Sequence, residues 1–166
     1  GILEASFIVF RLPPYFENFG KRLIKSPKVY FVEPGLAAHL LGIREPAQIG
    51  LSPSLGGLFE NLVVVEALKS FYNRGEEADL YFFRDSGGLE ADLLVGKRER
   101  LIPIEIKASR TFSPEFCASL PKIQALSPKM TSGIVAYAGE REQEFRGTRV
   151  VDYRRLDAAL HAETGS

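Results

Sequence analysis

Residues 89–107, with the sequence LEADLLVGKRERLIPIEIK, constrain the fold of this chain more than any other stretch. Apolar side chains dominate residues 91–95 and again residues 101–108, and the polar connection GKRER separates the two runs. Two apolar runs around a short polar connection are typical of a β-hairpin. The stretch therefore predicts two neighbouring antiparallel strands that enter the core of the protein.

The second of these strands is expected to have one apolar and one charged face. Successive side chains of a strand point to opposite faces, so Glu105 and Lys107 share one face and isoleucines occupy the other. The length of the connection places Asp92 opposite Glu105 or one residue away. Directly opposed residues have Cβ atoms roughly 5 Å apart, and two carboxylates at that distance repel each other.

A divalent cation would relieve this repulsion. Mg²⁺ commonly binds through one or two carboxylates and keeps several waters for chemistry. Asp92, Glu105 and the carbonyl of Ile106 are therefore candidate ligands of Mg²⁺ or Mn²⁺. Lys107 lies on the same face as Glu105 and is placed to contact an anion that the metal holds.

Pro103 bears on this geometry because proline has no N–H to donate to a strand ladder. Either the paired strand begins near Ile104, or the hairpin bulges at Pro103. A bulge would shift the register by one residue and move Asp92 relative to Glu105.

Residues 58–72 predict a helix, because apolar side chains recur there at helical spacing. Glu60 has apolar residues at i+3, i+4, i+7 and i+8, which places its carboxylate on an apolar stripe. An unpartnered buried charge is costly, so Glu60 is expected either to cap the helix start or to point at a cation.

The rest of this half of the chain predicts strands over 80–84, 133–138 and 149–152 and helices over 116–125 and 154–160. The helix over 116–125 is expected to break or kink at Pro121. The crossover between the strands at 101–108 and 133–138 is long enough to make them parallel. From residue 58 onward the predicted order is helix, three strands, helix, strand, which defines an α/β (α+β) fold with a mixed sheet.

Three regions are expected along the chain: 1–46, a linker loop over 47–57 that is rich in Gly, Ser and Pro, and the domain 58–166. The first region predicts a helix end over 2–6, strands over 7–11 and 28–32, and a helix over 35–42. His39 on that helix has no Cys or Asp at a ligand spacing and is interpreted as a surface residue.

Several basic residues are candidates for contact with a nucleic-acid backbone, namely Lys21, Arg22, Lys97, Arg98, Arg100 and Arg110. For Lys21 and Arg22 the alternative is a solvated loop with the nearby aromatic rings folded inward. Gln124 is a further candidate for substrate contact. Glu90 shares a strand face with Asp92, and Arg84 binds either a phosphate or an acid across the turn.

Charge and composition limit the classes of function. Twenty-one Lys and Arg balance 21 Asp and Glu, so the chain has no overall field that attracts nucleic acid. The lone Cys117 cannot form an intrachain disulfide, which fits a reducing cytoplasm. No apolar run approaches the roughly 20 residues needed to span a bilayer, so no membrane contact is expected. A Gly-X4-Gly-Lys-Ser/Thr phosphate loop is absent from the sequence.

Asp92 followed by Glu105-Ile106-Lys107 on the next strand resembles the signature of the PD-(D/E)XK nuclease superfamily. More specifically, the chain resembles the uncharacterised domain that follows the ATPase module in a large family of bacterial and archaeal AAA+-type proteins. The matching stretches are LEASFIVFRLPPYFENFGKRLIKSPKVYF, the pentapeptide GLFEN, and EAD with IPIEIKAS. A departure is Glu33-Pro34, where that family usually has Asp and a small polar residue.

The resemblance implies a restriction-endonuclease-like α-β-β-β-α-β core, preceded by the end of a winged-helix-like unit. It implies metal-dependent hydrolysis of DNA, with Asp92 and Glu105 on the metal, Lys107 on the phosphate and Glu60 as an acid from the first core helix. It also implies an ATPase module upstream in the same polypeptide. Two alternatives remain: a catalytically silent module that binds nucleic acid or a partner protein, and a structural or homo-oligomerisation domain.

Overall fold

A computed structural model describes residues 1–17 and 26–162, so the candidates Lys21 and Arg22 lie outside the described residues. The helices are α1 (Ile2–Ala5), α2 (Pro34–Leu40), α3 (Pro46–Ile49), α4 (Leu55–Asn73), α5 (Leu120–Gln124) and α6 (Leu156–Ala162), with 3-10 turns η1 (Pro114–Cys117) and η2 (Tyr153–Arg155). The strands are β1 (Val9–Leu12), β2 (Lys28–Phe31), β3 (Leu80–Arg84), β4 (Glu90–Lys97), β5 (Arg100–Lys107), β6 (Ile134–Tyr137), β7 (Gln143–Phe145) and β8 (Thr148–Asp152).

Six strands form a mixed sheet in the order β3-β4-β5-β6-β8-β7. β3, β4 and β5 are antiparallel neighbours, whereas β5, β6 and β8 run parallel to one another. The predicted parallel pairing of the strands on either side of the crossover is therefore confirmed. Along the chain α4 is followed by three strands, then by α5 and β6, which is the predicted order of elements.

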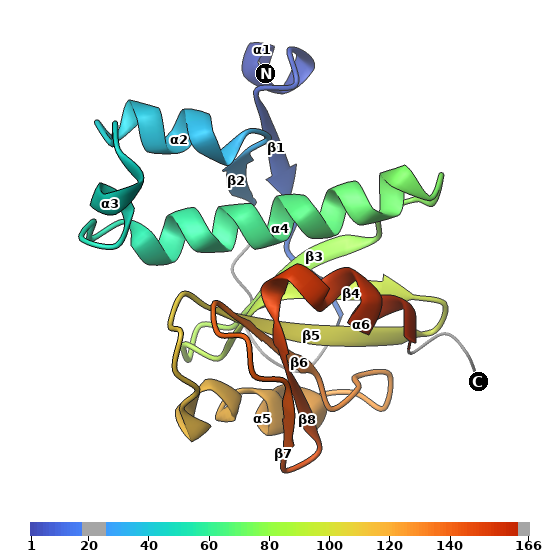
Figure 1. The fold of residues 1–166 in the computed structure, drawn as a ribbon. Helices are drawn as coiled ribbons and strands as arrows, with labels where there is room; N and C mark the ends of the chain where they lie inside the picture. Colours follow the sequence, from blue (N-terminus) through green and yellow to red (C-terminus); the bar gives the residue numbers. More distant parts are fainter. Residues whose placement is uncertain (18–25, 163–166) are drawn as a thin grey trace.

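Helices cover both faces of the central strands (Figure 1). α4 and α6 pack on the face that carries Ile102, Ile104 and Ile106. α5 and η1 pack on the opposite face, where Leu120 and neighbouring apolar side chains are fully buried. Coverage on both sides explains why β5 is almost continuously buried rather than alternating between buried and exposed positions.

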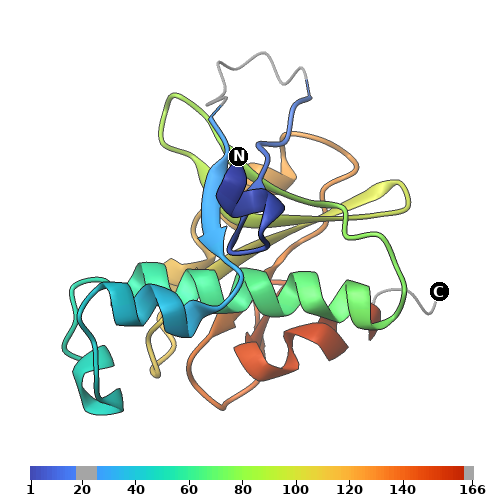
Figure 2. The same cartoon turned by 90° about the horizontal axis from the view of Figure 1, so that it is seen from above.

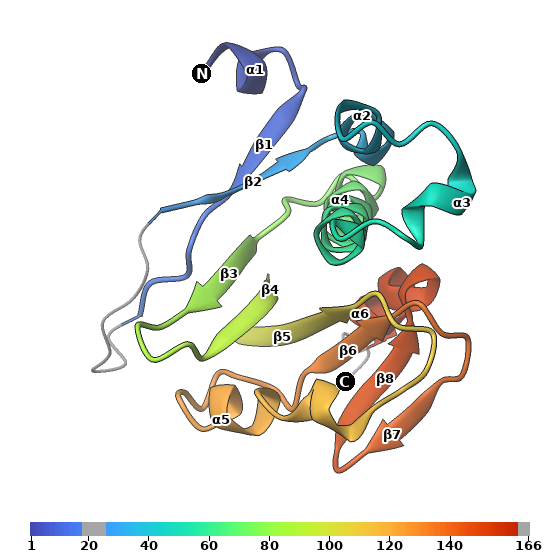
Figure 3. The same cartoon turned by 90° about the vertical axis from the view of Figure 1, so that its left-hand side faces the viewer.

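The N-terminal ribbon of β1 and β2 runs at a steep angle to α4 (Figure 2), and α2 lies against α4 on the side away from the six-stranded sheet (Figure 3). Leu12 and Tyr30 of the ribbon belong to the same core as α4 and the sheet. The side chain of Asn61 accepts a hydrogen bond from the Phe31 N–H at 2.9 Å and donates one to the Phe31 carbonyl at 2.8 Å. The amide of Asn61 thus ties β2 to α4.

The hairpin differs from the sequence prediction in two ways. Its connection is only Arg98 and Glu99, with Arg98 in the left-handed region at φ 57°, because both strands extend further into the polar segment than expected. Pro103 pairs in register with Leu94, and the irregularity lies instead between β3 and β4, where Asp92 and Leu93 of β4 together oppose Phe82 of β3. Pro103 is tolerated because the ladder to β6 begins one residue later, at Ile104.

Three other expectations about secondary structure are corrected. The segment 47–57 is not a loop throughout, because α3 reaches into it and α4 begins at Leu55. The helix expected over 116–125 is divided into η1 and α5, and Pro121 lies in the first turn of α5, where its missing N–H costs nothing. The short edge strand β7 was not predicted. Within the described ranges, no helix has the length and apolar character needed to cross a membrane.

We expect Asn61→Ala to lower the free energy of unfolding by about 2–3 kcal/mol, because it leaves two backbone groups of Phe31 without partners at a site that is 6% exposed. Urea denaturation followed by circular dichroism measures the loss. The matched control is Asn73→Ala at the exposed end of the same helix, which should cost less than about 0.5 kcal/mol. Equal costs at the two positions would contradict the role of Asn61.

Candidate functional site

The site lies where the ladder between β4 and β5 ends. The last paired residues are Leu93 and Ile104, and beyond them the Ile106 N–H donates to Asp92 Oδ2 at 2.8 Å. A cavity of about 490 Å³ opens beside this point. Its lining comes from the β3–β4 turn, the two strands and the η1–α5 segment, namely Gly87, Gly88, Leu89, Glu90, Asp92, Glu105, Lys107, Glu115, Ala118, Ser119 and Lys122.

The structure brings Asp92, Glu105 and Lys107 together at this cavity. Glu105 and Lys107 lie on the face of β5 away from α4, and Asp92, one residue beyond the last ladder pair, directs its carboxylate toward Lys107 and the Ile106 N–H. Lys107 Nζ lies 2.7 Å from Glu105 Oε2 and 3.6 Å from Asp92 Oδ2. The two carboxylates therefore share one ammonium group.

Ser119, at the N-cap of α5, completes the surroundings of Glu105 by donating from its hydroxyl to Glu105 Oε1 at 2.6 Å. Only 8% of the Glu105 side chain is exposed, so both of its oxygens are partnered inside the protein. Sequence reasoning missed Ser119, because its contact depends on how α5 docks against the sheet rather than on a local pattern.

Burial raises the pKa of Asp92 to about 6, and the neighbouring charge of Glu105 acts in the same direction. The ammonium of Lys107 and the Ile106 N–H favour the charged carboxylate and offset part of this rise. For Lys107, burial alone would lower the pKa, but the charges of Asp92 and Glu105 outweigh it and the pKa is raised. The pocket thus holds a fixed cation beside a carboxyl group that is partly protonated near neutral pH.

Glu60 does not line this cavity. Its Oε1 accepts hydrogen bonds from Lys28 Nζ at 2.9 Å and from the Tyr30 hydroxyl at 2.5 Å. The capping interpretation is wrong, because α4 begins five residues earlier at Leu55. Glu60 instead points at a cation, which is the second of the two expected arrangements.

Lys28 links Glu60 to the edge of the cavity. Its Nζ also lies 2.8 Å from Oε1 of Glu90, which lines the cavity and is 3.5 Å from Arg84. Arg84 therefore pairs with an acid across the turn. The alternation of Lys28 and Tyr30 on one face of a strand was a usable sequence signal, but nothing in the sequence indicated which acids they meet.

The donor set of the cavity fits a hard divalent cation. Asp92 and Glu105 supply carboxylate oxygens. Ile106 does not line the cavity, but the N–H and C=O of a strand residue face the same neighbouring strand, so its carbonyl is expected on the side of β5 that faces β4. Two carboxylates with a carbonyl leave room in the coordination shell for the waters that Mg²⁺ retains. In the parts of the chain that are described, no three His, Cys, Asp or Glu side chains are grouped to hold a metal, so a site here depends on this oxygen set.

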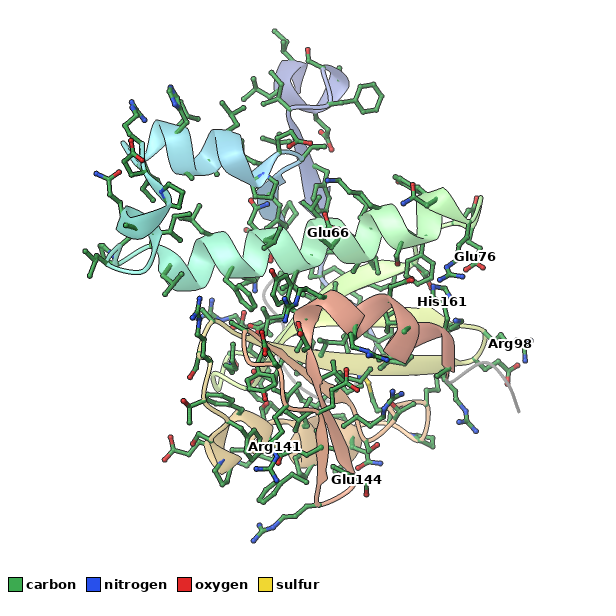
Figure 4. All side chains as sticks on the ribbon, viewed as in Figure 1. Glu66, Glu76, Arg98, Arg141, Glu144 and His161 are labelled. Carbon is green, nitrogen blue, oxygen red and sulfur yellow. The ribbon has the colours of Figure 1, made fainter. Side chains whose placement is uncertain are left out.

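Three of the basic candidates lie away from the cavity. Lys97, Arg98 and Arg100 surround the β4–β5 turn, at the opposite end of the two strands from Asp92. Figure 4 shows Arg98 at the tip of this hairpin, and Lys97 Nζ is 3.2 Å from Nδ1 of His161 on α6. Contact of these three residues with nucleic acid stays a prediction. They do not form part of the cavity wall.

The C-terminal side of the cavity also differs from expectation. Arg110 is exposed on the loop after β5, and Gln124 is exposed at the end of α5; neither lines the cavity. Lys122 lines it instead, two residues before Gln124. His39 is exposed on α2, as predicted.

These features define a mixed α/β domain with an acidic pocket at the end of a central antiparallel ladder. Residues 55–156 match the model of the family described as Domain of unknown function (DUF4143), and the chain belongs to this family. Residues 1–47 match a second family, Domain of unknown function (DUF8612). The gap between the two matches falls within the segment expected to connect two regions, whose division into domains stays a prediction.

Proteins similar to this chain occur in mycobacteria. Uncharacterized proteins of Mycobacterium tuberculosis and Mycobacterium bovis are each 32% identical to it over 138 residues, which is 83% of this chain. The matched region makes up 30% of the length of each relative. The chain therefore corresponds to a minor part of these longer proteins.

The raised pKa of Asp92 makes the stability of the fold depend on pH. The pKa of Asp92 is 3.8 in the unfolded chain and about 6 in the folded protein. The contribution of its protonation to the free energy of unfolding is therefore complete below pH 4 and is lost as the pH rises through 6. We expect Asp92→Asn to raise the free energy of unfolding by about 1–3 kcal/mol at pH 8, and to leave it almost unchanged at pH 4.

Urea denaturation at the two pH values measures this difference. Glu66→Gln on the exposed side of α4 is the control and should show no such pH dependence. A gain of equal size at pH 4 and pH 8 would mean that the effect of Asp92→Asn does not arise from the charge of Asp92.

Proposed function

We propose that this chain carries a divalent-metal-dependent nuclease site of the PD-(D/E)XK type and hydrolyses phosphodiester bonds of DNA. The observation that carries the proposal is the arrangement of Asp92, Glu105 and Lys107 at one cavity, with the two acids on neighbouring strands. The order of elements around them, one helix, three strands, a helix and a parallel strand, also supports a core of this type.

Each residue of the site has a distinct role in this proposal. Asp92, Glu105 and the Ile106 carbonyl would hold Mg²⁺ or Mn²⁺, which when bound would lower the pKa of a water ligand and polarise a phosphoryl oxygen. The Ile106 N–H fixes the orientation of Asp92, and the Ser119 hydroxyl fixes that of Glu105. The ammonium of Lys107 stabilises negative charge that develops on the phosphate.

The balance of charges favours a role inside a larger protein. A neutral chain binds DNA weakly and loses that binding as salt rises, so substrate capture needs a further basic surface. The mycobacterial relatives are much longer than this chain. We propose that an ATPase module of the same polypeptide supplies or delivers the DNA, in a cytoplasmic setting.

A second candidate function is a catalytically silent module that binds nucleic acid or a partner protein. The observation that favours it is the completeness of the contacts around Glu105, whose two oxygens already accept from Lys107 and Ser119. A site in which internal partners satisfy both oxygens has less need of a metal ion.

The proposal predicts nicking of supercoiled plasmid by the chain at low ionic strength with Mg²⁺ or Mn²⁺, and loss of nicking when EDTA removes the metal. Asp92→Asn and Lys107→Met should each lower the rate by about 100-fold or more, because each removes a charge at the reacting group. Agarose gels resolve nicked from supercoiled DNA, and circular dichroism shows whether the variants fold.

The controls are Glu66→Gln and Lys69→Met, a pair of exposed charges on α4 that lies outside the cavity. Their rates should equal that of the unmodified chain. Metal-independent nicking, or nicking that survives in both site variants, would refute the proposal. Retention of DNA without cleavage would favour the silent module.

A further inference from the structure

A lysine of the N-terminal ribbon lies between two acidic side chains next to the candidate metal site. Lys28 Nζ lies 2.9 Å from Glu60 Oε1 on α4 and 2.8 Å from Glu90 Oε1 on β4. The Lys28 side chain is 22% exposed, and its ammonium lies 5.3 Å from the centre of the Phe82 ring. Lys28 is therefore built into the protein between two carboxylates rather than extended into solvent.

This position adjoins the Asp92–Glu105 pair. Glu90 and Asp92 are two residues apart on β4, and both line the cavity. Burial raises the pKa of the Tyr30 hydroxyl, and the charges of Glu60, Asp92 and Glu90 raise it further. Glu90 pairs with Lys28 and also lines the cavity, so it joins the two acidic positions into one cluster.

The formal charges of this cluster leave a net negative charge for at most one divalent ion. Four carboxylates, on Glu60, Glu90, Asp92 and Glu105, face two ammonium groups, on Lys28 and Lys107, and the guanidinium of Arg84, which is 3.5 Å from Glu90. One negative charge remains, which a single Mg²⁺ or Mn²⁺ more than neutralises. Glu115 and Lys122, which also line the cavity, carry opposite charges and do not alter this balance.

The ribbon that supplies Lys28 is held firmly against α4. Asn61, next to Glu60, exchanges two hydrogen bonds with the Phe31 backbone, and the Tyr30 hydroxyl donates to Glu60. These contacts fix the distance between β2 and the acids. The cation at this position is therefore part of the fold and is present whether or not a metal ion binds.

We propose that the ammonium group of Lys28 forms permanent ion pairs with Glu60 and Glu90, so that the cavity binds a single divalent ion, at Asp92 and Glu105. Glu60 is then a positioning residue that acts through Lys28, and not a metal ligand. The inference rests on the proposed function and deepens it, because it assigns the metal stoichiometry of the site and draws the N-terminal ribbon into it.

Isothermal titration of the chain with Mn²⁺ tests this inference without any measurement of activity. The unmodified chain should bind one Mn²⁺, and Lys28→Met, which keeps the length of the side chain but removes its charge, should bind two. The second ion would replace the lost ammonium between Glu60 and Glu90. In the double variant Lys28→Met/Glu60→Gln the count should return to one.

Tyr30→Phe is the matched control, because it removes the other hydrogen bond to Glu60 and leaves the ammonium in place. It should bind one Mn²⁺, like the unmodified chain. Circular dichroism establishes whether each variant is folded. If Lys28→Met does not fold, Glu60→Gln provides the comparison. Glu60→Gln should still bind one Mn²⁺, and its loss of Mn²⁺ affinity should be smaller than the loss in Asp92→Asn by about tenfold or more.

The possible outcomes separate this inference from the proposed function. Two Mn²⁺ ions on the unmodified chain, or a single ion on folded Lys28→Met, would overturn the inference and leave the metal site at Asp92 and Glu105 standing. An affinity loss in Glu60→Gln equal to that in Asp92→Asn would also overturn it. No binding of Mn²⁺ to the unmodified chain would overturn the metal site itself, and the inference with it.

Discussion

The hydrogen bond from the Ile106 N–H to the Asp92 carboxylate is the interaction on which the site depends. A buried backbone N–H needs a partner, and at this point of β5 the partner is a side chain of β4 rather than its backbone. The two strands are therefore joined beyond their last paired residues without continuing their ladder. The cavity lies at this transition, and Glu105 and Lys107 face into it.

Electrostatics around the cavity follow from the same arrangement. Carboxylates on adjacent strands repel, and the fold offsets this repulsion with lysines from two different strands, Lys107 of β5 and Lys28 of β2. Neither lysine is on the same strand as Asp92. The acids are thus kept close together by contacts of the tertiary structure, and Asp92 still has a raised pKa. A cluster of this kind costs stability, which is a common property of sites that bind or react.

The sequence was sufficient for features that repeat locally. Alternation along β5 placed Glu105 and Lys107 on one face, and the crossover length made β5 and β6 parallel. Contacts between distant segments could not be derived, because no periodicity links Lys28 to Glu60 or Ser119 to Glu105. The turn between β4 and β5 is shorter than expected for a different reason. Charged side chains occupy strand positions at the exposed tip of the hairpin, where polarity no longer distinguishes a strand from a loop.

The common core of the ribbon and the sheet has a consequence for how the protein is divided. The matched range 55–156 excludes Leu12, Tyr30 and Leu160, all of which are buried in the cluster that includes α4 and β5. A fragment trimmed to that range would uncover apolar surface on both sides of its longest helix. The buried core around α4 and β5 thus extends beyond the span of sequence similarity, and excision at its borders would cut through hydrophobic packing.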